Sequence, residues 1–253
     1  MLDEETLKQS ERQAKAQGEL VRVSKKTWVM RSVAIAALTF FMFYNLTIAW
    51  LMWDPLRIYS TLMPLHTLIV FIVGWIFFRN RATGQVPDNL VSVIVPVYNQ
   101  EKLIGDVINA VLKSTYQNIE VIAVNDGSKD GTGKILDALA EKKSKLQVIH
   151  KPNGGKRTAV AAGFYASHGE YIALIDSDSV VDKKAIEHFM KTFSANPKVG
   201  GVVGKCKVLN ANRNFLTKCQ DAWYDYAFNI HKTAESTFGA VLCCSGCLAA
   251  YRR

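Results

Sequence analysis

The sequence predicts an α/β fold: a mostly parallel sheet with helices on both faces, preceded by two membrane-spanning helices. Three observations lead to this prediction. From residue 90 onward, short continuous apolar runs alternate with segments of helical period, which is typical of strands buried on both faces. Two long apolar runs precede that region. Three of the short runs end in polar motifs, which a parallel sheet would bring to one edge.

The alternation after residue 90 defines the expected elements in order. The predicted strands are 90–96, 119–125, 146–150, 171–176 and 199–204. The predicted helices are 101–113, 132–143, 156–167, 183–194 and, longer and amphipathic, 215–237.

Residues 28–53 and 61–78 are the two apolar runs, and the first holds one charge, Arg31. The first run is long enough to span a bilayer, and the second is shorter. A buried core hairpin is the alternative. The basic residues that flank the pair on its outer sides are Lys25, Lys26, Arg31, Arg79 and Arg81. The positive-inside rule therefore predicts an integral membrane protein in contact with lipid, with both ends in the cytoplasm.

These signals divide the chain into four parts. Residues 1–27 read as a polar cytoplasmic helix or tail, 28–78 as the membrane pair, 79–89 as a linker and 90–253 as a globular domain. The net charge of +9 is partly explained by the flanks of the apolar runs. No basic stripe with interleaved aromatic residues occurs in the globular part, so we expect no nucleic-acid partner.

The chain has five cysteines, at positions 206, 219, 243, 244 and 247. The last three include a C-x-x-C spacing, but no second cysteine or histidine pair follows at the distance of a zinc site. We therefore expect packed free thiols in a reducing compartment rather than a zinc site.

Polar motifs follow three of the predicted strands. They are Pro96–Glu101, Asn125–Ser128 and the pair Asp176 and Asp178. Alternate residues of an extended chain point the same way, so the two aspartates share a face. Any one of these motifs could be a turn or a helix cap. Together, at successive strand ends, they predict one crevice.

The segment 153–158, NGGKRT, follows the third strand and opens a helix. Lys156 and Arg157 at a helix N-terminus favour a phosphate group. The segment lacks the first glycine of a P-loop, and the chain has no G-x-G-x-x-G motif. With an acid for a base or ribose and two carboxylates for Mg²⁺ or Mn²⁺, the crevice suits a nucleoside-diphosphate donor. The metal would act as a Lewis acid on the departing diphosphate.

These motifs carry a resemblance. PVYN, NDGS-x-D, NGGKR-x-A and DSD, in this order, resemble family 2 glycosyltransferases of the GT-A fold. The downstream segments 199–210 and 227–253 are similar to the processive membrane synthases of hyaluronan, chitin and cellulose. The resemblance covers about residues 90–253. It implies an inverting, metal-dependent transfer of sugar from a UDP-sugar to a growing polysaccharide.

The resemblance also implies roles around the nucleoside. Asp126 would hydrogen-bond the uracil, and Tyr98 would pack against the base. Pro96 begins the same motif and belongs to the expected donor site. Gln100 stands where relatives often have an acid, with Glu101 beside it, so either is a candidate for the nucleotide contact.

The resemblance implies that the next two motifs bind the diphosphate and the metal. Lys156 and Arg157 would contact the diphosphate or the donor edge. Asp176 would face the ribose or the sugar, and Asp178 would bind the metal, with Asp176 as a second candidate ligand.

Ser245, Gly246 and Cys247 match a loop near the acceptor sugar, although many relatives have proline in place of Cys247. In this family an acidic motif, a Q-x-x-R-W motif and further membrane helices follow that loop, and the sequence stops at Arg253 before them. The general base is therefore not assigned. Two alternatives remain: a non-catalytic donor-binding fragment or assembly partner, and an enzyme that glycosylates a polyprenyl phosphate or another lipid.

Overall fold

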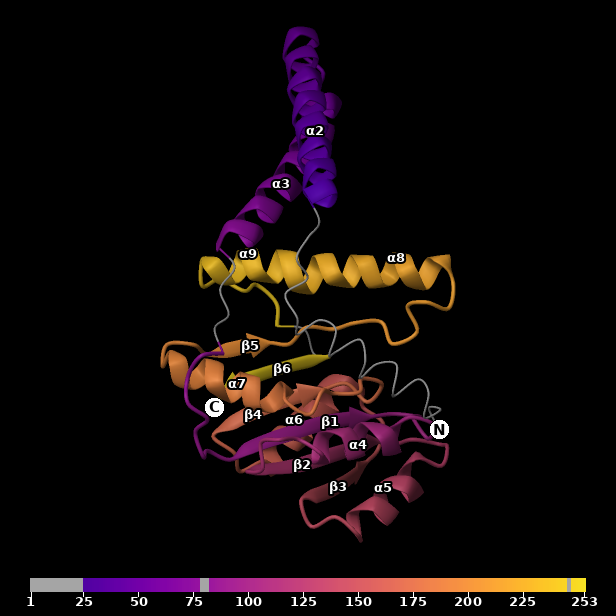
Figure 1. The fold of residues 1–253 in the computed structure, drawn as a ribbon. Coiled ribbons are helices and arrows are strands. Elements are labelled where there is room, and N and C mark those ends of the chain that lie inside the picture. The colour runs from indigo at the N-terminus through magenta and orange to yellow at the C-terminus, as the bar shows by residue number, and fades with distance from the viewer. Residues whose placement is uncertain (1–24, 78–81, 245–246) are drawn as a thin grey trace. The chain divides into compact units, whose positions relative to one another are not determined.

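The computed structural model describes residues 25–77, 82–244 and 247–253, which fall into two units (Figure 1). The α/β unit comprises residues 79–208 and 241–253, and the helical unit comprises the residues up to 78 together with 209–240. The helix or tail expected before residue 25 and the linker residues 79–81 lie outside the described residues.

A six-stranded sheet in the order β3-β2-β1-β4-β6-β5 forms the centre of the α/β unit. Its strands are β1 (Val91–Val97), β2 (Ile119–Asp126), β3 (Leu146–Lys151), β4 (Tyr171–Ile175), β5 (Gly201–Val203) and β6 (Leu248–Arg252). The first four strands pair in parallel, and β6 runs antiparallel between β4 and β5. The predicted mostly parallel α/β fold is confirmed.

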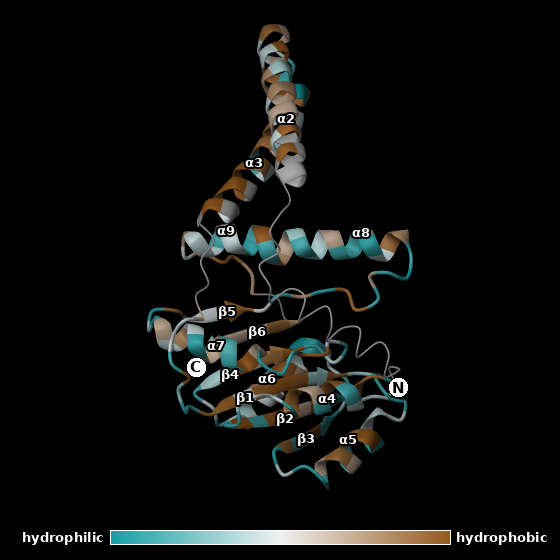
Figure 2. Ribbon diagram, in the orientation of Figure 1, coloured by the Kyte–Doolittle hydropathy of each residue, from teal (hydrophilic) through white to brown (hydrophobic). Residues whose placement is uncertain are grey.

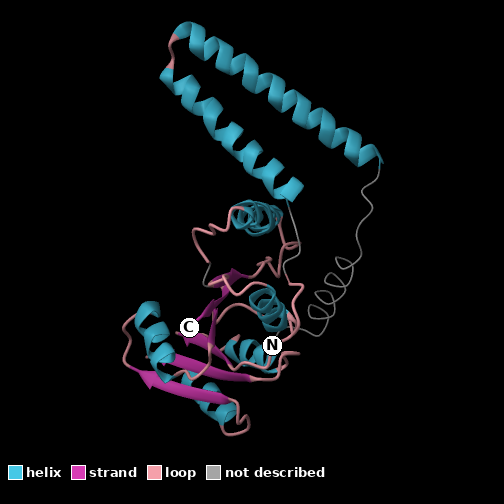
Figure 3. Ribbon diagram, turned by 90° about the vertical axis from the view of Figure 1, so that its left-hand side faces the viewer, coloured by secondary structure: helices cyan, strands magenta, loops and turns pink. Residues whose placement is uncertain are grey.

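Helices cover both faces of this sheet (Figure 3). They are α4 (Ile104–Leu112), α5 (Thr132–Ala140), α6 (Lys156–Ala166) and α7 (Ala185–Ala195). Alternate residues of β1 point to opposite faces. The larger core packs α4, α5 and α7 against one face, and α6 packs against β1 and β2 on the other. A Cβ on Gly163 of α6 would lie 2.5 Å from Ile94 Cγ2, so this close packing requires glycine.

Strand β6 is the element that the sequence did not predict. The strand is short, with the sequence LAAYR, and contains two alanines, which are weak strand formers. The strand forms because it pairs on both sides, with β4 and with β5. Ala249 and Ala250 are buried there. The backbone hydrogen bonds to both neighbouring strands hold β6 in place without large side chains.

The strand order places a switch point between β1 and β4. From β1 the chain winds through β2 to β3 on one side, and then returns to lay β4 on the other side. In open α/β sheets, ligands bind at such a point, outside the carboxyl ends of the strands. Ile94 pairs with Leu174, so Pro96 and Asp176 each follow this pair by two residues at that edge.

In the helical unit, α2 (Lys25–Met52) and α3 (Pro55–Phe77) are joined by a tight turn at Trp53 and Asp54. The segment 54–60, which separates the two apolar runs in the sequence, is therefore mostly helical. The cause is a strong helix start: Asp54 Oδ1 accepts hydrogen bonds from the backbone N–H groups of Leu56 and Arg57 at 3.1 and 3.3 Å, and Pro55 is the first residue of the helix.

One segment of the described residues, Pro55–Gly74, is long and apolar enough to cross a membrane by length and composition. The α2 helix lies where the first apolar run was predicted, but its apolar part, Thr39–Met52, is shorter. Figure 2 shows the hydrophobic colour along α3 and in the strands of the sheet.

The long helix predicted at 215–237 is present as three consecutive segments. They are α8 (Phe215–Tyr224), the π-helix η1 (Asp225–His231) and α9 (Lys232–Thr237). Asn214 begins α8 with a reciprocal capping box that it forms with Thr217. Within the helical unit, α3 packs against η1 and α9.

Candidate functional site

A cavity of about 200 Å³ lies at the carboxyl ends of β1, β2 and β4. Most of the predicted site residues line it. The lining consists of Pro96, Val97, Tyr98, Asp126, Lys156, Ala159, Asp176, Ser177 and Asp178. Four sequence motifs separated by up to about eighty residues thus meet at the switch point of the sheet, as the parallel arrangement predicted.

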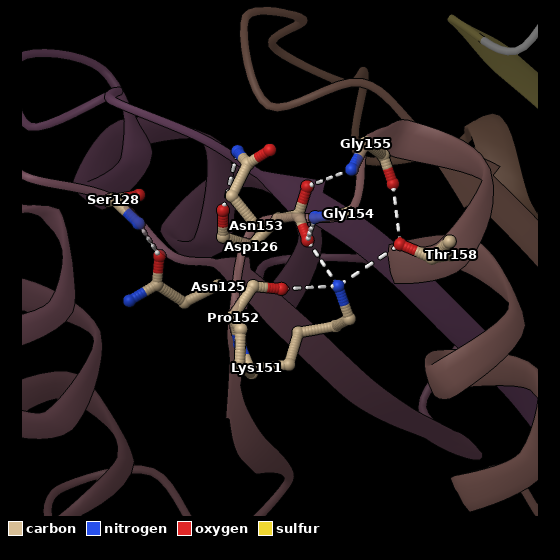
Figure 4. A network of polar contacts seen from close by, with 9 residues as sticks. All are labelled: Asn125, Asp126, Ser128, Lys151, Pro152, Asn153, Gly154, Gly155 and Thr158. Atoms are coloured by element: carbon tan, nitrogen blue, oxygen red, sulfur yellow. Dashed lines mark hydrogen bonds and ion pairs between the residues drawn. The ribbon is translucent and has the colours of Figure 1, made fainter.

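Asp126, the last residue of β2, is buried and lines this cavity. Its carboxylate accepts three hydrogen bonds from its neighbours (Figure 4). Its Oδ1 accepts hydrogen bonds from Lys151 Nζ at 2.5 Å and from the Gly154 backbone N–H at 3.0 Å. Its Oδ2 accepts one from the Gly155 N–H at 2.8 Å. Since each carboxylate oxygen accepts two hydrogen bonds, Oδ2 retains one acceptor position. Gly155 has a φ of +85°, a conformation that glycine adopts without strain.

Lys151 is a site residue that the sequence analysis missed. Its ammonium donates three hydrogen bonds: to Asp126, to the Pro152 carbonyl oxygen at 2.7 Å and to Thr158 Oγ1 at 3.0 Å. The Thr158 hydroxyl in turn donates to the Gly155 carbonyl at 2.9 Å. Lys151 therefore ties the end of β2 to the turn before α6 and to the first turn of that helix. Its position opposite Asp126 in the β2–β3 register was the available signal.

Hydrogen bonds decide the charge state of Asp126. Burial alone would raise the pKa of its carboxyl group, but the hydrogen bond from Lys151 and those from Gly154 and Gly155 outweigh it and hold the pKa below the ordinary value. Asp126 is therefore an anion at neutral pH and can only accept hydrogen bonds from a ligand.

Asp176 and Asp178 follow β4 on the opposite wall of the cavity. Lys156 Nζ lies 2.5 Å from Asp176 Oδ1, so this lysine pairs with the carboxylate rather than projecting freely. Asp178 is exposed, and its Oδ1 accepts a hydrogen bond from Ser179 Oγ at 3.2 Å. The two acids thus differ, because among the described residues Asp176 has a cationic partner and Asp178 has none.

The two carboxylates fit a hard divalent cation by the chemistry of their oxygens. Mg²⁺ usually binds through one or two carboxylates together with substrate phosphates. Asp176 and Asp178 could supply such a pair. Among the described residues, no group of three or more His, Cys, Asp or Glu side chains is arranged to hold a metal, so the phosphates of a ligand would be needed to complete the coordination.

Gln100 and Glu101 do not line this cavity. Glu101 Oε2 accepts a hydrogen bond from the Gly131 backbone N–H at 2.7 Å, at the start of α5. The backbone N–H of Gln100 donates to Thr132 Oγ1 at 2.8 Å. These contacts tie the turn after β1 to the turn after β2, and they leave Glu101 bound to the start of α5 rather than facing the cavity.

Arg157 faces a second cavity, of about 340 Å³, between α6 and the β4–β6 part of the sheet. Its lining is largely apolar and includes Ile172, Leu174 and Tyr165. Lys156 and Arg157 are adjacent in sequence, but the structure places them at different cavities.

Cys247, which was predicted near the acceptor, lies with its Sγ atom 3.1 Å from Cys206 Sγ. Its contact with Cys247, burial and the charges of Asp176 and Asp178 all raise the pKa of the Cys206 thiol. The five cysteines form no disulfide among the described residues. Cys219 and Cys243 are exposed and the other three are partly buried, so the prediction of packed thiols is wrong for Cys219 and Cys243. Ser245 and Gly246 lie outside the described residues.

A parallel sheet whose switch-point crevice collects carboxylates and a lysine defines an α/β protein with a site for a polar, charged ligand. The family model described as "Glycosyl transferase family 2" matches residues 92–253. The chain belongs to this family.

Two curated relatives and one solved structure illustrate the likeness. The chain is 43% identical over 101 residues to glycosyltransferase GlyG of Streptococcus pneumoniae, covering 40% of this chain and 34% of that protein. It is 30% identical over 196 residues to hyaluronan synthase of Streptococcus pyogenes, covering 75% and 46%. The chain therefore spans less than half the length of either relative.

The structure is similar to the mannosyltransferase PcManGT of Pyrobaculum calidifontis, which was solved in complex with GDP-Man and Mn²⁺. The TM-score is 0.58 at 24% identity, over 74% of this chain and 52% of that one. This likeness supports the GT-A fold.

Proposed function

We propose that the chain is the donor-binding part of a membrane-anchored, metal-dependent, inverting glycosyltransferase that transfers sugar from a UDP-sugar to a growing polysaccharide. The observation that carries the proposal is the single cavity in which Tyr98, Asp126, Lys156, Asp176 and Asp178 meet. The similarity to hyaluronan synthase supports a polymer as the product over a glycosylated lipid.

The nucleoside would bind on the β1 and β2 side of the cavity. The remaining acceptor position on Asp126 Oδ2 suits the N3–H of uracil, because an ionised carboxylate accepts but does not donate. Tyr98 is 45% exposed beside it and offers a ring face for stacking. Since the cavity is smaller than the 300 Å³ or more of most ligand pockets, the sugar would extend beyond it toward the acceptor.

The diphosphate would lie between Lys156 and the two aspartates. A bound Mg²⁺ or Mn²⁺ supplies Lewis-acid stabilisation of the departing diphosphate. Asp178 is exposed and has no cationic partner among the described residues, so it is the first choice as a metal ligand, with Asp176 as the second. The base that deprotonates the acceptor is assigned to none of the described residues.

Membrane anchoring is supported by the helical unit. The segment Pro55–Gly74 has the composition of a membrane span, and α2 and α3 expose large apolar side chains such as Phe40, Trp50 and Leu56. Exposure on this scale favours lipid as the partner of the helices. The basic flanks of α2 and α3 favour cytoplasmic ends and a cytoplasmic donor site.

Titration calorimetry with the full chain in detergent tests the donor site. We expect UDP to bind in the presence of Mn²⁺, more tightly than GDP, and Asp178→Ala to abolish the effect of the metal on UDP binding. Glu141→Ala removes an exposed acid at the far end of α5 and serves as the matched control. UDP binding that does not depend on the metal, or that Asp178→Ala leaves unchanged, would contradict the assignment.

A transfer assay separates catalysis from binding alone. Radiolabelled UDP-sugars, offered with oligosaccharide or polyprenyl-phosphate acceptors, should label the oligosaccharide. Label that appears only in the lipid fraction would favour the lipid acceptor. Donor binding without transfer to either acceptor would favour a non-catalytic donor-binding role for this chain.

A further inference from the structure

The cation of Lys156 is held by Asp176, one of the two carboxylates proposed for the metal. The Nζ to Oδ1 distance is 2.5 Å, and both side chains line the same cavity with Asp178. An ammonium at this distance occupies one acceptor position of Asp176 Oδ1 and leaves others open, but its positive charge repels a divalent cation at the same carboxylate. A metal and Lys156 therefore compete for the negative charge of Asp176.

The exposure of the pair makes it exchangeable. The Lys156 side chain is 60% exposed and that of Asp176 is 26% exposed, so the ion pair is partly solvated and contributes little to stability. Lys156 is the first residue of α6 and its side chain has four methylene groups, so it can reach another anion in the cavity without a change in the helix. By contrast, Lys151 is committed to three acceptors at once.

We infer that Lys156 is a positioning residue that exchanges partners: it neutralises Asp176 when the donor site is empty and moves to the diphosphate when the metal and nucleotide bind. This inference rests on the proposed donor site. When Lys156 moves to the diphosphate, the Asp176 carboxylate loses its cationic partner and becomes available to bind the metal. Metal and nucleotide therefore bind cooperatively for two reasons, the direct contact between them and the transfer of this lysine.

The exchange predicts effects of opposite sign from one substitution. Lys156→Gln removes the competing cation, so Mn²⁺ alone should bind more tightly, by up to about fivefold, which is the range for an exposed ion pair. The same substitution removes a charge-assisted contact to the diphosphate, so UDP in the presence of Mn²⁺ should bind about tenfold more weakly. The factor by which UDP tightens Mn²⁺ binding should fall, and by linkage the reciprocal factor falls equally.

The experiment measures Mn²⁺ binding to the full chain by electron paramagnetic resonance, with and without UDP. Lys156→Arg keeps the cation and should retain the wild-type affinity for Mn²⁺ alone. Lys142→Gln removes an exposed lysine beyond the end of α5 and controls for net charge. Hydrogen exchange of the β4 amides confirms that each variant is folded.

Tighter binding of Mn²⁺ alone to Lys156→Gln, but not to Lys142→Gln, is the expected result. Unchanged or weaker binding to Lys156→Gln, or no Mn²⁺ binding to either protein, would overturn the inference. If wild-type protein binds UDP with metal dependence while Lys156→Gln shows no gain for Mn²⁺, the proposed function stands and the exchange fails. If Mn²⁺ binds but UDP does not, the proposed function fails.

Discussion

Replacing Lys151 by methionine is the sharpest test of the network beneath the cavity. The change removes the ammonium and keeps an unbranched side chain. Asp126 is 4% exposed and Lys151 is 21% exposed at the side chain, so the carboxylate would stay buried with only the N–H groups of Gly154 and Gly155 as donors. Removing one partner of a buried ion pair costs about 3–5 kcal/mol. Because Lys151 is partly solvated and two donors remain, we expect the free energy of unfolding to fall by about 2–3 kcal/mol.

The measurement has to report on the α/β unit alone. All five tryptophans fall within the residue ranges of the helical unit, so tryptophan fluorescence would follow the wrong part of the chain. Hydrogen exchange of the β2 amides, recorded against denaturant concentration in the full chain, gives the local free energy of opening.

A double-mutant cycle separates the ion pair from general loss of packing. Lys151→Met, Asp126→Asn and the double variant should give a coupling free energy of about 2 kcal/mol. Lys142→Met, at an exposed position, should change stability by less than about 0.5 kcal/mol. A coupling below about 0.5 kcal/mol, or a Lys151→Met variant as stable as Lys142→Met, would refute the network as the support of the site.

Three further predictions follow from the same structure. Gly163→Ala should lower the free energy of unfolding by about 1–3 kcal/mol, because its methyl group would lie 2.5 Å from a β1 side chain. Gly105→Ala, which has open space around it in α4, is the control and should be neutral or stabilising by up to about 1 kcal/mol. Equal effects of the two changes in denaturant unfolding would contradict the close packing of α6 on β1. Folding lowers the pKa of Asp126, so the ionised carboxylate stabilises the fold above the ordinary pKa of 3.8, and this stabilisation is lost as the pH falls through the folded pKa. The free energy of opening of the β2 amides should therefore depend less on acid in Asp126→Asn than in the wild-type protein. Identical pH profiles for the two proteins would exclude a contribution of the Asp126 charge to stability. Diamide, a two-electron oxidant, should link Cys206 to Cys247 with loss of both thiol protons, because their sulfur atoms are 3.1 Å apart; peptide mapping that finds other pairings would contradict the placement of β5 and β6.

The sequence predicts the parallel half of the sheet well because each of its strands is a continuous apolar run. β1 and β2 are buried along almost their whole length, and burial on both faces is what such runs indicate. β6 is not predicted in this way, because its alanines give no periodic apolar pattern and the strand is stabilised by pairing with two neighbouring strands. The start of α3 was also misplaced, since the helix begins at Pro55, directly after the capping residue Asp54, and not at residue 61, where the second apolar run begins.

For the site, the sequence predicts the positions that follow from strand topology but not the directions of the side chains in the turns. Asp126 and Asp176 end parallel strands, so topology alone brings them to one edge. Side-chain direction within a turn depends on contacts with other turns, which the sequence does not reveal. Glu101 therefore binds the start of α5, and Lys151, which follows no recognised motif, holds the centre of the network.

The two acid–lysine pairs at and beneath the cavity differ in burial, and this difference suits them to different roles. The pair of Asp126 and Lys151 is shielded, and breaking it would leave an unpaired buried charge, so it is suited to hold a fixed geometry. The pair of Asp176 and Lys156 is solvated, and water compensates either group when they separate, so it is suited to exchange. A charged ligand that enters the cavity thus meets one carboxylate whose partner is fixed and another whose partner can leave. This difference predicts that high salt weakens the Lys156 contact far more than the Lys151 contact, because screening acts on exposed charges.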